Sequence, residues 1–224
     1  MELRSVDIAR SLWFGHMVDF NPRGMALSPI TLSPIAFYLA NIYKFKKLPP
    51  PNADLGNADG VKFEDGEFVF KGDEPPVSVT LTLYQEGLTA DTRFSTECSD
   101  AFLIDLFTRI TKDFKIPPYE GIIHKKRYFS QLYISIIKSF SVINPKLQEI
   151  ATFLSKNTEA GEEIIFEFGG VSFWPEQTAK WIPSAFTIER VVNVPFSENR
   201  YFSRAALQTE KHIELLNKLE NILS

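Results

Sequence analysis

The chain has 224 residues, of which 44% are hydrophobic and 23% charged, and its formal net charge is −4 at pH 7. These proportions are typical of a globular protein with a sizeable core, and they exclude a chain that is disordered throughout. An acidic chain lacks the basic footprint that general DNA or RNA binding requires, so a nucleic-acid partner is not favoured.

The single cysteine and the absence of a clear membrane segment predict the cellular location. Cys98 is the only cysteine, so no disulfide can form within the chain, and there is no Asn-x-Ser/Thr glycosylation site. Both features favour a reducing, cytoplasmic location. The uncharged segment 24–43 has the length of a membrane helix, but its two prolines and several polar residues favour a buried segment of a soluble protein without a membrane partner.

The first predicted elements are a helix and a hairpin. Apolar residues recur at helical spacing over about residues 34–45, after a Ser-Pro start and before three consecutive prolines. Alternation over Val61–Phe70, interrupted by Asp65 and Gly66, then predicts a β-hairpin with a two-residue Asp-Gly turn.

The next predicted elements complete a meander and add a helix. Alternating residues predict strands at Val77–Tyr84 and Leu88–Phe94, joined by a short turn. Capping residues at Ser95–Ser99 precede an amphipathic pattern that extends to Phe114, which predicts a second helix.

The second half of the chain repeats these element types in another order. We expect a central strand, a short helix, a hairpin with a Gly-Gly turn, a further strand and a C-terminal amphipathic helix. In chain order these are Tyr128–Phe140, the segment after Asn144 and Pro145, Ile164–Trp174, Ala185–Val194 and Arg204–Leu223.

The order of elements predicts the fold class. Strands and helices do not alternate regularly, so a parallel, doubly wound sheet is not expected. We predict an α+β fold with a mainly antiparallel sheet, a meander with Asp-Gly and Gly-Gly hairpins, packed by about four helices. Residues 1–224 are interpreted as a single domain with a possible sub-boundary near residues 117–121.

Recognisable catalytic motifs are absent from the sequence. His16, His124 and His212 are far apart and form no zinc-binding motif, and the glycine-rich phosphate-binding motifs are missing. Cys98 near a helix start is compatible with a reactive thiol, but no histidine lies near it in sequence, so a structural role is favoured. We therefore assign no catalytic residue, metal ligand or cofactor.

Charged residues near the strand-to-helix junction offer an alternative binding site. Asp91 and Arg93 are expected to share one face of a strand, where they could anchor a small molecule or peptide in a pocket lined by some of the 20 phenylalanines. Asp91 and Asp100 could also serve a metal-dependent enzyme. The basic run 124–127 could contact single-stranded nucleic acid, although the solvent-exposed start of a β-strand is the favoured interpretation.

Loop aromatics are the leading candidate for recognition. Phe173, Trp174 and Trp181 lie beside a predicted hairpin and loop, and exposed aromatics are effective interface anchors. The leading hypothesis is a non-enzymatic interaction protein that binds a protein partner or self-associates, for example as a dimer. The alternative is the ligand-binding α+β domain with an aromatic pocket, and the third possibility is the carboxylate-dependent enzyme.

Overall fold

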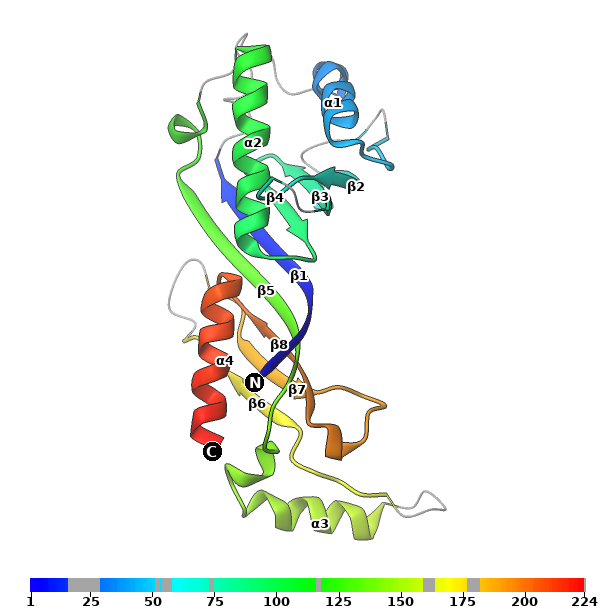
Figure 1. Cartoon of the computed structure of the whole chain (residues 1–224), viewed down its shortest axis with the longest axis vertical. Helices are drawn as coiled ribbons and strands as arrows, with labels where there is room; N and C mark the ends of the chain where they lie inside the picture. Colours follow the sequence, from blue (N-terminus) through cyan, green and yellow to red (C-terminus); the bar gives the residue numbers. More distant parts are fainter. Residues whose placement is uncertain are drawn as a thin grey trace. The chain divides into compact units, whose positions relative to one another are not determined.

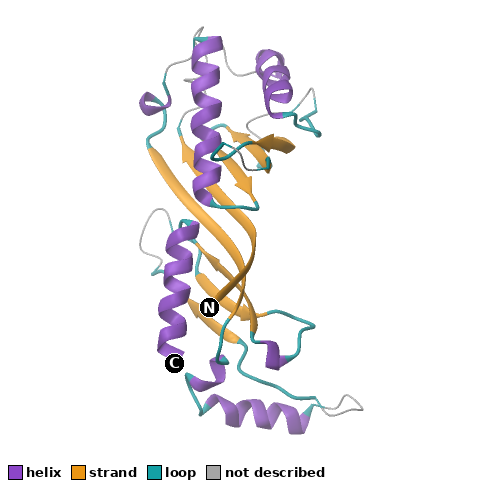
Figure 2. Cartoon of the chain, in the orientation of Figure 1, coloured by secondary structure: helices purple, strands orange, loops and turns teal. Residues whose placement is uncertain are grey.

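The computed structural model describes residues 1–15, 29–50, 53, 58–72, 75–115, 118–158, 164–176 and 182–223. Trp181 and His16, both singled out by the sequence, lie outside the described residues. Within those residues the fold is α+β, with an eight-stranded antiparallel sheet and four α-helices (Figure 2). The predicted fold class is therefore confirmed.

The strand order of the sheet is β2-β3-β4-β1-β5-β8-β7-β6. The strands are β1 (Glu2–Phe14), β2 (Val61–Phe68), β3 (Val77–Tyr84), β4 (Gly87–Thr92), β5 (Lys125–Ser135), β6 (Gly170–Phe173), β7 (Phe186–Arg190) and β8 (Arg200–Ala205). The α-helices are α1 (Pro29–Tyr43), α2 (Thr96–Phe114), α3 (Leu147–Asn157) and α4 (Thr209–Leu223). The predicted pair β3 and β4 is present, with Tyr84 opposite Gly87, whereas β1 and β8 were not predicted.

The predicted Asp-Gly hairpin is wrong. Residues 61–68 form one strand, β2, which pairs with β3 and changes register between Phe63 and Gly66. Asp65 takes a left-handed conformation with φ 57°, so the Asp-Gly pair makes a bulge within the strand rather than a turn between two strands. A Cβ on Gly66 would lie 2.5 Å from the Phe45 ring, so this glycine permits close packing of an aromatic side chain.

The predicted Gly-Gly hairpin is also wrong. Residues 164–169 are not a strand, and β6 pairs with β7 instead, with Phe173 opposite Phe186. A Cβ on Gly170 would lie 2.0 Å from the carbonyl oxygen of Ile188. Gly170 therefore permits close approach of β7 to β6, and its presence does not require a turn.

The chain forms two compact units. The α2 unit comprises residues 8–130 and 207–209, and the α4 unit comprises residues 1–7, 131–206 and 210–224. Strands β1 and β5 each contribute to both units. The segment Tyr119–Gly121, near the predicted sub-boundary, is a short 3-10 helix within the α2 unit.

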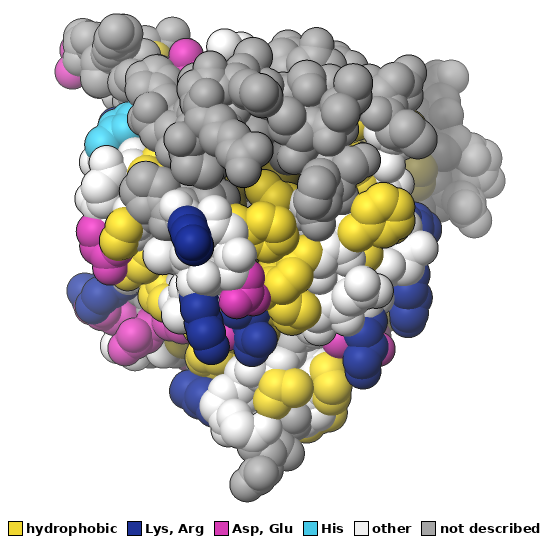
Figure 3. Space-filling model, turned by 90° about the horizontal axis from the view of Figure 1, so that it is seen from above, with side chains coloured by type: hydrophobic (Ala, Val, Ile, Leu, Met, Phe, Trp, Pro, Cys, Tyr) yellow, Lys and Arg dark blue, Asp and Glu magenta, His cyan; other side chains and the backbone are white. Residues whose placement is uncertain are grey.

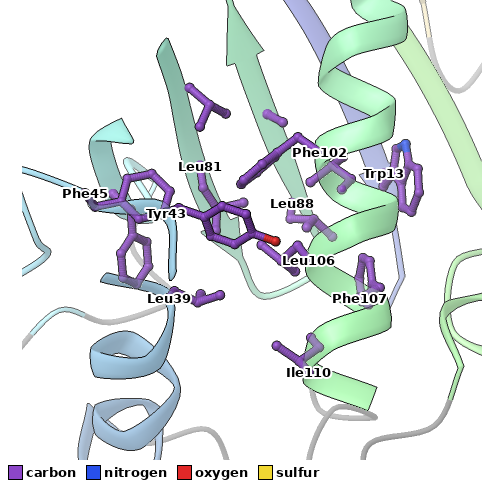
Figure 4. Close-up of a cluster of buried hydrophobic side chains, with 14 of the residues drawn as sticks. Trp13, Leu39, Tyr43, Phe45, Leu81, Leu88, Phe102, Leu106, Phe107 and Ile110 are labelled. Carbon is purple, nitrogen blue, oxygen red and sulfur yellow. The ribbon is translucent and has the colours of Figure 1, made fainter. Parts of the chain in front are cut away.

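In the α2 unit, helix α2 lies along one face of strands β1, β3 and β4 (Figure 1). The Ser95 hydroxyl accepts a hydrogen bond from the Cys98 amide and caps the helix N-terminus, as the capping pattern predicted. The core between helix and sheet is rich in aromatic side chains, and Trp13 and Phe107 stack with ring centroids 5.7 Å apart. Figure 4 shows this core, with Trp13, Leu39, Tyr43, Phe45, Leu81, Leu88, Phe102, Leu106, Phe107 and Ile110 labelled.

In the α4 unit, α4 packs against β5, β7 and β8. Its core consists of Leu132, Ile134, Ile136, Phe140, Ile188, Tyr201, Leu216 and Leu223. Helix α3 contributes little to a core, since Ala151 is its only buried residue. In α4, Leu216 and Leu223 are buried, whereas Ile222 is 76% exposed.

The two halves of the chain repeat one topology. Each runs strand, helix, three strands, helix, and the strand orders β2-β3-β4-β1 and β6-β7-β8-β5 correspond element by element. Helices α2 and α4 begin at Thr96 and Thr209, each four residues after the preceding strand ends at Thr92 and Ala205. Within the α2 unit these two threonines exchange hydrogen bonds, from Thr96 N to Thr209 Oγ1 (3.0 Å) and from Thr209 N to Thr96 Oγ1 (2.8 Å).

Candidate functional site

The strongest candidate for a recognition surface is the β6 edge, defined as residues Gly170–Trp174. Strand β6 is the last strand of the sheet, and among the described residues only β7 pairs with it. Phe173 is 63% exposed and Trp174 is 76% exposed. The β6 edge has no charged residue, so it lacks the charges that protect many edge strands against other chains.

The register shows which backbone groups of this edge are free for a partner. The Arg190 amide donates to the Gly169 carbonyl oxygen at 2.8 Å, and residues of an antiparallel pair alternate between bonded and non-bonded positions. Val171 and Phe173 therefore direct their N–H and C=O groups toward β7. The N–H and C=O groups of Gly170 and Ser172 therefore point away from β7. If the alternation is continued one residue beyond the strand, the backbone groups of Trp174 point away from β7 as well.

Side chains of the β6 edge alternate between two faces. Val171 packs against the core of the α4 unit, and the Phe173 ring lies on the same face, 5.9 Å from the ring of Phe186. Ser172 and Trp174 consequently lie on the opposite face of the strand. The edge thus offers aromatic surface on both faces together with backbone donors and acceptors that point away from β7.

The edge at the other end of the sheet is protected. Strand β2 forms a bridge at Glu64 with Lys47, in which the Glu64 amide donates to the Lys47 carbonyl oxygen at 2.9 Å. Ion pairs add charge along it, with Lys47 3.3 Å from Glu64 and Lys44 2.8 Å from Glu67. Strands β2 and β6 occupy equivalent positions in the repeated topology. Strand β2 is bridged and charged, whereas β6 is neutral and pairs only with β7 among the described residues.

The structure pairs Asp91 with a residue that the sequence did not suggest. Arg10 on β1 lies opposite Asp91 on β4, and its Nε and Nη2 each donate to a carboxylate oxygen of Asp91 at 2.6 Å. The hydrogen bonds that Arg10 donates to Asp91 raise the pKa of Arg10. Arg93 is exposed and lies beyond the end of β4 at Thr92, so it does not share a strand face with Asp91.

Asp100 joins a cluster on the helix-covered side of the α2 unit. Its carboxylate accepts hydrogen bonds from Trp13 Nε1 at 2.9 Å and from the Tyr128 hydroxyl at 2.8 Å. Burial and the bond to Asp100 raise the pKa of Tyr128 to about 12. The Lys126 ammonium lies 3.6 Å from the centroid of the Trp13 ring, a cation–π contact. Both carboxylate oxygens of Asp100 are therefore engaged in holding core aromatics.

Asp105 has a separate set of partners. It accepts hydrogen bonds from the Tyr43 hydroxyl at 2.8 Å and from Arg109 Nε at 2.7 Å, and burial raises the pKa of Tyr43. The carboxylates of Asp91, Asp100 and Asp105 thus have different partners although they are close in sequence. In the described ranges no group of three or more His, Cys, Asp or Glu side chains could hold a metal ion.

The cysteine and one histidine that the sequence singled out are buried. Cys98 is 0% exposed, and its amide donates to the capping Ser95 hydroxyl. His212 is also 0% exposed, and burial lowers its pKa to about 4. The Ser203 hydroxyl donates to the Thr187 carbonyl oxygen at 3.0 Å, so its oxygen is free to accept from His212 Nε2 at 2.8 Å. Both side chains are therefore enclosed by the fold.

The basic run 124–127 contains Lys126, whose ammonium group is placed against Trp13. On the face drawn in Figure 3, lysine and arginine side chains lie among acidic and hydrophobic ones and do not form one basic field. No helix in the described part of the chain is long and apolar enough to cross a membrane.

Sequence reasoning identified Phe173 and Trp174 by residue type, but it placed them in a hairpin that does not form. Strand order, which makes β6 an edge, has no local sequence signal. No protein-family model matches the chain, and no curated protein matches it either.

Proposed function

We propose that this protein acts through protein–protein contact rather than catalysis, and that it self-assembles through the β6 edge. The observation that supports the proposal is the exposure of Phe173 and Trp174 on an uncharged edge that, in the described part of the chain, pairs only with β7. Edge strands in natural proteins are blunted by short length, charge, proline, bulges or a covering segment. Strand β6 is short, with four residues, but it has no charge, proline or bulge, and such an edge is suited to a partner that covers it.

The contrast with β2 strengthens the proposal. The β2 edge has the bulge, the charges and the bridging segment that prevent strand addition. Exposed aromatic side chains are also the residue types that anchor interfaces, because they bury a large area for few rotatable bonds.

Sedimentation velocity over a range of protein concentrations tests the proposal. The wild-type chain should sediment at a whole multiple of 25.5 kDa, and Trp174→Ala should weaken this association by at least about tenfold, the equivalent of roughly 1.4 kcal/mol. Ile222→Ala is a matched control, since Ile222 on α4 is also 76% exposed, and it should associate like the wild type.

Two results would contradict the proposal. A wild-type chain that stays monomeric at high micromolar concentration refutes self-assembly. Equal association of the Trp174→Ala and Ile222→Ala variants shows that the contact surface lies elsewhere. Circular dichroism of each variant shows that the fold is retained, which is expected because both side chains are largely exposed.

A further inference from the structure

We infer that the occupant of the β6 edge is the β6 edge of a second copy of this chain, paired antiparallel about a two-fold axis through Ser172. This inference rests on the proposed function and specifies its partner and register. It follows from three properties of residues 170–174: the direction of their backbone groups, their side chains and their lack of charge.

The backbone groups select the register. Two outward-facing residues must meet to form a hydrogen-bonded pair across the new interface. With Ser172 opposite its own copy, Gly170 meets Trp174 of the second copy, and Trp174 meets the second copy's Gly170. All three outward-facing residues are then paired. Shifting the centre to Val171 or Phe173 pairs only two of the three.

The side chains fit the same register. Trp174 lies opposite Gly170, which has no side chain to clash with the indole ring, and aromatic residues commonly lie across from strand glycines. On the other face, Val171 lies opposite Phe173 of the second copy, a β-branched and aromatic pair of the kind that stabilises sheets. Phe173 is 63% exposed and Trp174 is 76% exposed, and this pairing would cover part of that exposed surface.

A second copy fits this edge better than an unrelated strand because the sequence is self-complementary. Closed two-fold interfaces use the same patch on both subunits, so each contact occurs twice. No charged residue lies between Gly170 and Trp174, so antiparallel self-pairing opposes no like charges across this short strand.

Disulfide trapping tests the register directly. In a hydrogen-bonded antiparallel pair the Cα atoms are about 5.5 Å apart, which suits a disulfide. Ser172→Cys should therefore form a covalent dimer under mild oxidation, visible on a non-reducing gel. Ser197→Cys is the matched control, since Ser197 is exposed and belongs to the same unit, and it should stay largely monomeric. Native Cys98 is buried and should not contribute.

Ser172→Pro provides a second test. The Ser172 N–H points away from β7, so a proline there removes no hydrogen bond to β7 but blocks pairing with a second copy. The variant should fold and sediment as a monomer. Should it fail to fold, the disulfide experiment still decides.

The outcomes separate this inference from the proposed function. A monomeric wild-type chain overturns both. In a second outcome, Trp174→Ala weakens association, but Ser172→Cys forms no disulfide and Ser172→Pro associates like the wild type. This result retains assembly through this surface but overturns the β6–β6 register. A rapid, specific Ser172→Cys dimer supports it.

Discussion

The ion pair between Arg190 and Glu167 should be among the most sensitive points of the α4 unit. Arg190 Nη2 lies 2.6 Å from Glu167 Oε2, and the two side chains are only 10% and 16% exposed. Arg190 Nη1 also donates to the Phe196 carbonyl oxygen at 3.0 Å, and Ser139 donates to the other oxygen of Glu167. The pair therefore joins segments around residues 139, 167 and 196 to strand β7.

Replacing Glu167 by Leu should lower the free energy of unfolding by about 4 kcal/mol, because removing one partner of a buried ion pair leaves an uncompensated charge. Arg190 Nε has no hydrogen-bond partner in the described structure, and the remaining acceptors of the guanidinium, such as the Phe196 carbonyl oxygen and Asn199 Oδ1, carry no charge to replace the carboxylate. The double variant Glu167→Leu with Arg190→Met should recover most of the loss, since apolar side chains of similar volume often replace a buried pair without cost.

Urea denaturation followed by circular dichroism measures these differences. Glu198→Leu is the control, because its ion pair with Arg200 is 3.4 Å long and about half exposed, and its loss should change stability by less than about 1 kcal/mol. A loss for Glu167→Leu no greater than that of the control would refute the reasoning, as would a double variant less stable than the single one.

Three further predictions concern the two cores. The folded-state pKa of His212 is about 4, below the value near 6.5 in an unfolded chain, so its neutral form stabilises the fold above pH 6.5 and this stabilisation is lost as the pH falls toward 4. In urea titrations the free energy of unfolding should therefore fall by about 2 kcal/mol from pH 7 to pH 5, and His212→Gln should lack this fall. Asp100→Leu should destabilise the chain by roughly 2 kcal/mol in thermal or urea unfolding, because Trp13 Nε1 and the Tyr128 hydroxyl lose their carboxylate acceptor. An unchanged stability would show that these hydrogen bonds contribute nothing. Gly66→Ala should cost about 1–3 kcal/mol by forcing the Phe45 ring aside, whereas Gly121→Ala, where a Cβ meets nothing within 4 Å, should leave the melting temperature nearly unchanged.

Elements with local signals could be predicted from the sequence. The β3–β4 pair and the Ser95-capped helix depend on residues close together in the chain, and both are present. Strand β1 was missed because its first half is largely exposed and carries charges, so its alternation is weak. Strand β8 was partly taken for the start of the last helix.

Elements that depend on distant partners could not be predicted. An Asp-Gly pair suits a turn and a bulge equally well, and the packing of Phe45 against Gly66, together with pairing to β3, decides for the bulge. Asp91 pairs with Arg10, which is 81 positions away in the chain. The repeated topology is visible in the order of elements but left no repeat that the sequence alone revealed.

The candidate site shows the same division. The aromatic character of Phe173 and Trp174 is readable from the sequence, whereas the open edge that presents them depends on the position of β6 at the end of the sheet.

Hydrogen exchange of the Ser172 amide, measured at protein concentrations above and below dissociation, tests the central claim most directly. We expect slow exchange in the assembled protein and fast exchange on dilution, while the Ile188 amide, in strand β7 between β6 and β8, exchanges slowly at both concentrations. Exchange at Ser172 that stays fast in a protein shown to be assembled would contradict the claim that the β6 edge is the contact surface.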